Sequence, residues 1–178
     1  MKGASNSMKD SNPLAFQQSL TFADLLVPYL SPPQRQALLR YRLAYHVMVK
    51  DTAGVKQAGP QLVSELMDIP LDSIAAENDR RYHETMEPFW SGTMDSTKIE
   101  GFQEEKQFAL NLYAREICSY LYKASNAYAA SLAANDPALH EELAWAVRCD
   151  ELIPKSPVFQ RLTAQLRQRI SNYSIDLR

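Results

Sequence analysis

The residues that could carry out chemistry are few and lie far apart in the chain. Histidine occurs at positions 46, 83 and 140, and cysteine at positions 118 and 149. A di-iron site in a helical bundle needs Glu-x-x-His pairs, because residues i and i+3 project into the same core, and no such pair occurs. The two cysteines are not spaced as zinc ligands. We therefore expect neither a metal site nor a cofactor.

Two further kinds of catalytic site are also missing from the sequence. There is no Gly-x-Ser-x-Gly nucleophile motif, and the five glycines are too scattered for a phosphate-binding loop. Two cysteines outside any CxxC motif are typical of buried thiols in a reducing compartment. We expect a cytoplasmic protein that is not an enzyme.

One pair of residues nevertheless has a spacing with a known catalytic use. Arg40 and His46 are separated by five residues on a segment expected to be helical. This spacing resembles the arginine–histidine motif of the HEPN-type helical ribonucleases, and the resemblance covers seven residues. It implies that Arg40 and His46 would act on the scissile phosphate of RNA without a metal. The alternative is that both side chains simply line one helix, with the arginine extending over apolar neighbours.

The charges of the chain are segregated. Residues 1–59 carry a net charge of +4, residues 60–105 of −8, residues 106–151 of −2 and residues 152–178 of +4. This pattern suits electrostatic steering of a partner protein, so we expect binding through charged surfaces. The side chains expected to take part are acidic in the middle of the chain and basic in its last helix: Glu77, Asp79, Glu84, Glu87, Arg161, Arg167 and Arg169.

The order of residues predicts an all-α fold. Ser31, Asp136 and Ser156 each precede a proline, which is the typical start of a helix. Residues 97–135 contain one glycine and no proline, and their apolar residues recur every three to four positions. We expect an irregular bundle of six or seven helices around one long central helix at 97–135. The other expected helices span residues 21–30, 32–51, 61–67, 72–86, 136–152 and 158–173.

The expected domain organisation is simple. Residues 1–18 are polar and lack helical periodicity, so we expect a flexible N-terminal segment. Residues 19–178 are expected to form a single helical domain. No run of about 18 apolar residues occurs, so we expect no membrane span.

Two features leave alternatives open. Tyr113, Tyr120, Tyr122 and Tyr128 form a stripe that is typical of a helical core, but they could also line a pocket for a hydrophobic or tetrapyrrole-like ligand. The last helix has an apolar stripe and three arginines, which is few for nucleic-acid binding; its docking against the acidic segment 60–105 is the favoured arrangement.

These observations favour a non-enzymatic protein-interaction or regulatory protein. An adaptor, a chaperone, an immunity protein or antitoxin, and a subunit of a larger complex would all fit. A HEPN-like ribonuclease and a ligand-binding helical protein are the alternatives. Nucleic acid is a less favoured partner than protein.

Overall fold

The computed structural model describes residues 12–133 and 136–176, with side-chain surroundings described up to residue 171. This part of the chain is all-helical and contains no strand, which confirms the predicted fold class. Its elements are α2 (Pro13–Leu25), η1 (Val27–Tyr29), α3 (Pro32–Met48), α4 (Thr52–Met67), α5 (Leu71–Trp90), η2 (Ser96–Lys98), α6 (Phe102–Ala109), α7 (Leu112–Ser131), α8 (Leu139–Leu152) and α9 (Pro157–Asp176).

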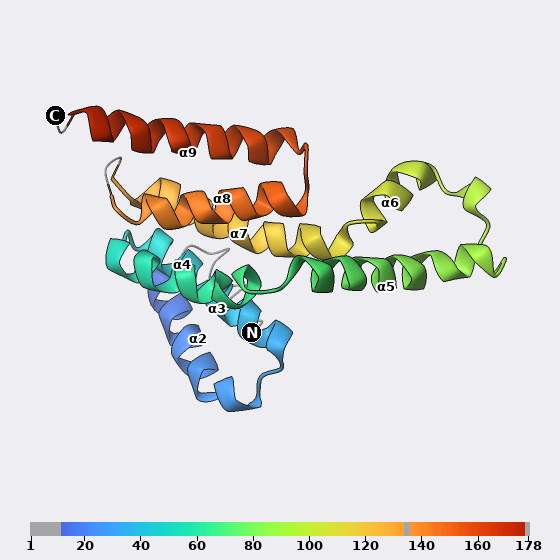
Figure 1. Cartoon of the computed structure of the whole chain (residues 1–178). Helices are drawn as coiled ribbons and strands as arrows, with labels where there is room; N and C mark the ends of the chain where they lie inside the picture. The colour runs from blue at the N-terminus through green and yellow to red at the C-terminus, as the bar shows by residue number, and fades with distance from the viewer. Residues whose placement is uncertain (1–11, 134–135, 177–178) are drawn as a thin grey trace.

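Helix α7 has more packing partners than any other helix. It contacts α3, α4, α5 and α8, while α9 lies on the outer side of α8 and α2 packs on α3 (Figure 1). Leu121 and Tyr128 of α7 are fully buried, and the Tyr128 ring meets the Trp145 ring of α8 with centroids 4.7 Å apart. A Cβ atom at Gly59 of α4 would lie 2.6 Å from the Tyr128 ring. Glycine at this position therefore lets α4 approach α7 closely enough to close the core.

The long helix expected at residues 97–135 is interrupted. Residues 96–98 form the short η2, α6 ends at Ala109, and α7 begins at Leu112. The side-chain oxygen of Asn78, on α5, accepts hydrogen bonds from the backbone N–H groups of Tyr113 and Ala114, at 2.9 and 3.2 Å. These two groups lie in the first turn of α7, where no preceding helical carbonyl is available to them. A cap supplied by a different helix thus defines where α7 begins.

Helix α4 is longer than expected because a tertiary contact supports a proline in its interior. The sequence predicted a helix only at residues 61–67, yet Gly59 and Pro60 also lie inside α4. An interior proline deprives the carbonyl four residues earlier of its donor, here Lys56. The Tyr128 hydroxyl lies 3.4 Å from that carbonyl oxygen and shares its one hydrogen between it and the Glu141 carboxylate, which is 3.1 Å away. The helix expected at residues 32–51 ends at Met48, and residues 52–54 begin α4, with Asp51 accepting from the Gly54 N–H at 3.0 Å.

The N-terminal prediction was wrong within the described residues. Helix α2 begins at Pro13, and the Asn12 side chain accepts from the Ala15 N–H at 3.1 Å. Residues 13–18, expected to be flexible, are therefore helical, while residues 1–11 lie outside the described residues. The predicted start of α3 is confirmed: the Gln34 side chain accepts from the Ser31 N–H at 2.8 Å, and Pro32 is the first helical residue.

Candidate interaction site on the α5–α6 arm

Helices α5 and α6, joined through η2, form a hairpin that projects beyond the packed helices (Figure 1). We call residues 71–109 the arm. Its base is held by contacts between α5 and α7, including the Asn78 cap. Its outer part is held by contacts between α5 and α6, where the rings of Phe89 and Phe102 lie 4.7 Å apart. The arm is therefore anchored at one end and carries its own small apolar contact at the other.

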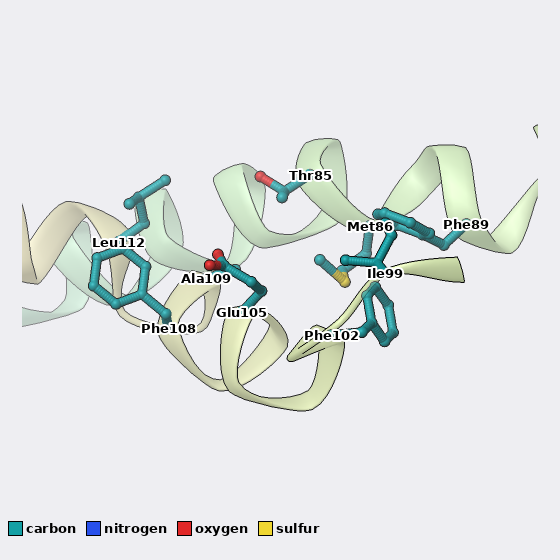
Figure 2. A pocket seen from close by; sticks show the side chains of 9 residues that line it. All are labelled: Thr85, Met86, Phe89, Ile99, Phe102, Glu105, Phe108, Ala109 and Leu112. Carbon is teal, nitrogen blue, oxygen red and sulfur yellow. The ribbon is translucent and has the colours of Figure 1, made fainter. Parts of the chain in front are cut away.

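An apolar pocket of about 330 Å³ lies between the two helices of the arm. Figure 2 shows Met86, Phe89, Ile99 and Phe102 gathered at one end of it, with Glu105 between this group and the opposite end. The volume is at the lower limit of cavities that hold small-molecule ligands, so it suits one or two apolar side chains better than a large ligand. The complete lining is Thr85, Met86, Phe89, Ile99, Phe102, Glu105, Phe108, Ala109 and Leu112.

The arm that contains this pocket is acidic. Six exposed carboxylates of the arm have no ion-pair partner among the described residues: Asp72, Asp79, Glu87, Glu100, Glu104 and Glu105. The arm's arginines are already paired, and Lys98 lies 3.6 Å from Asp95. Only Lys106 is left as an unpaired cation on the described arm. The result is an apolar pocket on an arm that carries an excess of negative charge.

The four acidic side chains predicted to bind a partner divide into two kinds. Glu77 bonds to Arg80 and Arg81, at 2.6 and 2.7 Å, and these hydrogen bonds lower the pKa of Glu77 to about 2. Glu84 pairs with Arg80, and Arg81 also bonds to Glu116 of α7 at 2.7 Å. Asp79 and Glu87 are exposed and belong to the unpaired carboxylates described above. Glu77 and Glu84 are thus engaged in ion pairs within α5, and Asp79 and Glu87 remain available.

The three predicted basic residues lie on a different surface. Helix α9 packs on α8, whereas the arm packs on α7 (Figure 1). The expected docking of α9 against the acidic segment was therefore wrong. Arg169 donates to the Leu132 carbonyl at 3.4 Å, while Arg161 and Arg167 are exposed.

A buried carboxylate lies beneath this outer helix. Glu142 of α8 is 1% exposed, and its Oε2 atom has no hydrogen-bond partner. Burial raises the pKa of Glu142 to about 7, and the positive charge of Arg169 opposes that rise. Nothing in the sequence pattern marks this residue, because His140, Glu141 and Glu142 look like an ordinary acidic first turn.

The structure does not bring Arg40 and His46 into one site. The Arg40 guanidinium lies over the Tyr41 ring, 5.3 Å from its centroid, and lines a groove of about 690 Å³ with Lys123 of α7. His46 lines a separate polar pocket of about 160 Å³, and its Nδ1 is 2.9 Å from Asp51 Oδ2. The His46 ring also fills the space beside Gly54, where an added Cβ would lie 1.9 Å from Nδ1. This placement gives His46 a role in packing α3 on α4.

The tyrosine stripe contributes to the core and to cation contacts. Tyr128 donates to Glu141 at 3.1 Å, and burial is the main cause that raises the pKa of its hydroxyl. The Tyr113 ring lies under the Arg81 guanidinium at 4.5 Å, and the Tyr120 ring under Lys123 at 5.4 Å. These contacts account for three of the four tyrosines without a ligand.

A second apolar surface was not foreseen from the sequence. One face of α2 packs on α3 through Phe16 and Leu20, and the opposite face is also apolar. Tyr29 of η1 is 84% exposed and Leu25 is 71% exposed. The signal was present as apolar residues on two opposite sides of α2, which is typical of a helix covered on both of those sides. The exposed set is Leu14, Phe22, Leu25, Leu26 and Tyr29.

Within residues 12–133 and 136–176, no helix is both long and apolar enough to cross a membrane. The same part of the chain contains no group of three or more histidine, cysteine, aspartate or glutamate side chains placed to hold a metal ion. Comparison with protein-family models, curated proteins and solved structures gives no match.

Proposed function

We propose that the chain is a non-enzymatic interaction protein whose arm binds a basic, amphipathic helix of a partner protein. The observation that carries this proposal is the apolar pocket of about 330 Å³, with Glu105 in its lining, on an arm that carries six exposed, unpaired carboxylates. An amphipathic helix is commonly bound by inserting its apolar residues into such a groove. An adaptor, a chaperone, an antitoxin and a complex subunit would all use a site of this kind. The two free thiols support a reducing compartment, which we propose is the cytoplasm.

The apolar residues and the carboxylates of the site would contribute differently to binding. Met86, Phe102 and their apolar neighbours would remove the partner's side chains from water, which supplies most of the binding free energy. The exposed carboxylates would attract the partner's lysines and arginines, which mainly increases the association rate. This attraction is screened by salt over about 10 Å at 0.1 M ionic strength.

The acidic arm is favoured over the apolar face of α2 because it specifies the charge of its partner. The exposed side chains of the α2 face are uncharged, and Asp24, the one acidic residue of α2, pairs with Arg42. That face therefore selects no particular charge. The two surfaces are separated in the fold, so variants can distinguish them.

A labelled helical peptide of leucine and lysine provides a defined test. We expect it to bind the full-length protein, and we expect affinity to fall at least about tenfold between about 0.05 and 0.5 M salt. A peptide with glutamate in place of lysine should not bind, because it is repelled. A peptide with serine in place of leucine, at equal charge, should bind at least about tenfold more weakly, because it cannot fill the pocket.

Charge reversal locates the site. Glu87→Lys with Glu104→Lys should slow association and weaken peptide binding about tenfold. Glu84 is unsuitable for this test because its reversal also breaks the pair with Arg80. The matched control is Glu65→Lys with Asp68→Lys, which makes the same charge change at exposed, unpaired positions outside the arm. Equal weakening by both pairs would refute the arm as the site.

Variants of α2 test whether the partner binds the apolar face of α2 instead of the arm. Phe22→Ser with Leu25→Ser removes apolar area from two exposed positions, which are 65% and 71% exposed. We expect this pair to leave peptide binding unchanged. If it abolishes binding while the arm variants do not, the partner surface is α2 and the proposal for the arm is wrong.

A further inference from the structure

Two cysteines from neighbouring helices face one another in the core. Cys118 of α7 is 2% exposed and Cys149 of α8 is 1% exposed. Each sulfur lies 3.9 Å from the backbone carbonyl oxygen of the other cysteine. This reciprocal contact places the two thiols side by side across the α7–α8 interface. It distinguishes them from two unrelated buried cysteines.

Two arginines flank this pair. Arg115 is three residues before Cys118, and Arg148 is directly before Cys149. The Nε atoms of both arginines are buried and have no hydrogen-bond partner. The pKa of Cys118 is lowered, chiefly by its hydrogen bond with Cys149 and also by the charges of Arg115 and Arg148, although burial acts in the opposite direction. The same hydrogen bond, together with burial, raises the pKa of Cys149.

Cys118, although buried, lies at the wall of a pocket. It lines a pocket of about 760 Å³ between the α6–α7 junction and the connection from α8 to α9. The charged residues of this pocket are Arg115 and Lys155, and its lining includes no carboxylate. Cys149 does not line this pocket. The two cysteines therefore differ in their position relative to this pocket as well as in acidity.

We propose that Cys118 and Cys149 form an oxidation-sensitive dithiol in which hydrogen peroxide attacks at Cys118 and Cys149 then closes an intramolecular disulfide between α7 and α8. The thiolate is the reactive form of cysteine, and neighbouring arginines favour it. A transient disulfide of this kind is compatible with a reducing compartment, where such bonds serve redox sensing.

The chemistry balances in two steps. The Cys118 thiolate attacks one peroxide oxygen and the O–O bond breaks, giving Cys118 sulfenic acid and a hydroxide that leaves as water with the thiol proton. The Cys149 sulfur then attacks the Cys118 sulfur, the S–O bond breaks, and the hydroxide leaves as a second water with the Cys149 proton. Peroxide is reduced to two waters, and the two thiols are oxidised to one disulfide.

The test uses the reduced full-length protein with hydrogen peroxide, followed by a thiol-alkylating reagent and intact-mass measurement. We expect loss of both alkylation sites in a monomeric product that dithiothreitol restores. Cys149→Ser should accumulate a dimedone adduct at Cys118, because the sulfenic acid has no resolving thiol. Cys118→Ser should form neither a disulfide nor an adduct at Cys149.

Arginine variants test whether the nearby positive charges increase the reactivity of Cys118. Arg115→Gln in the Cys149→Ser background should slow dimedone labelling at least about threefold, because a charge that favours the thiolate is removed. Arg161→Gln, an exposed arginine of α9, is the matched control and should not change the rate. The proposal is overturned if both thiols survive peroxide, if the bond forms only in denaturant, or if it links two chains. Equal labelling of Cys149 in the Cys118→Ser variant would also overturn it.

Discussion

Replacing Asn78 with alanine tests whether a side chain from α5 fixes the beginning of α7. Asn78 is 8% exposed, and its Oδ1 accepts from the N–H groups of Tyr113 and Ala114. The Ala114 donor is buried, whereas the Tyr113 donor is partly buried. Alanine removes the acceptor from both, and water can replace it fully only at Tyr113.

The expected cost follows from these two hydrogen bonds. Loss of a helix cap costs about 0.5–2 kcal/mol, and a buried donor left unsatisfied costs about 1–3 kcal/mol. Because one donor is buried and the other can reach water, we expect Asn78→Ala to lower the free energy of unfolding by about 2–4 kcal/mol. For a chain of this length, that corresponds to a fall in Tm of about 5–15 °C.

Denaturant unfolding followed by circular dichroism measures this cost directly. The midpoint should fall with no change in the slope m, because the same surface is exposed on unfolding. Asn78→Asp keeps an oxygen acceptor at the positive end of α7 and should cost less. Asn126→Ala, at an exposed position of α7, is the control and should change stability by no more than about 0.5 kcal/mol. An Asn78→Ala effect as small as that of the control would refute the tertiary cap.

Three further expectations concern stability. Leu121 is fully buried, so Leu121→Ala should cost about 2–5 kcal/mol by leaving a cavity, measured by the same unfolding experiment; a change within error would mean that this face of α7 is not core. The pKa of Glu142 is raised to about 7. Between about pH 4.5 and 7, this side chain is therefore protonated in the folded protein and has lost its proton in the unfolded chain. Its contribution to stability should therefore fall as pH rises through that window, by up to about 3 kcal/mol, and Glu142→Gln should flatten this pH dependence. Gly54→Ala should cost about 1–3 kcal/mol, because the new Cβ would lie 1.9 Å from His46 Nδ1; the cost should shrink in a His46→Ala background, and an equal cost in both backgrounds would show that the clash is not the cause.

The all-helical fold and the start of α3 were determined by residues close together in the sequence. Ser31, Pro32 and Gln34 lie within one helical turn of each other, so their hydrogen bonds are available as soon as that turn forms. The acidity of the arm could likewise be read from composition, because net charge does not depend on the fold. Which of the carboxylates are free to bind a partner could not be read from composition, because Glu77 and Glu84 are neutralised by arginines and Glu87 is not.

Other features were decided by contacts between residues far apart in the chain. The break before α7 depends on Asn78, which lies 35 residues before Tyr113, and the uninterrupted α4 depends on Tyr128, which lies 72 residues after Lys56. The pocket of the arm likewise takes its lining from α5, α6, α7 and the segment after η2. A local sequence pattern indicates how a segment can form hydrogen bonds to its own backbone groups within about one helical turn. When a distant side chain supplies the missing donor or acceptor, helix boundaries and pockets are decided only by the tertiary structure.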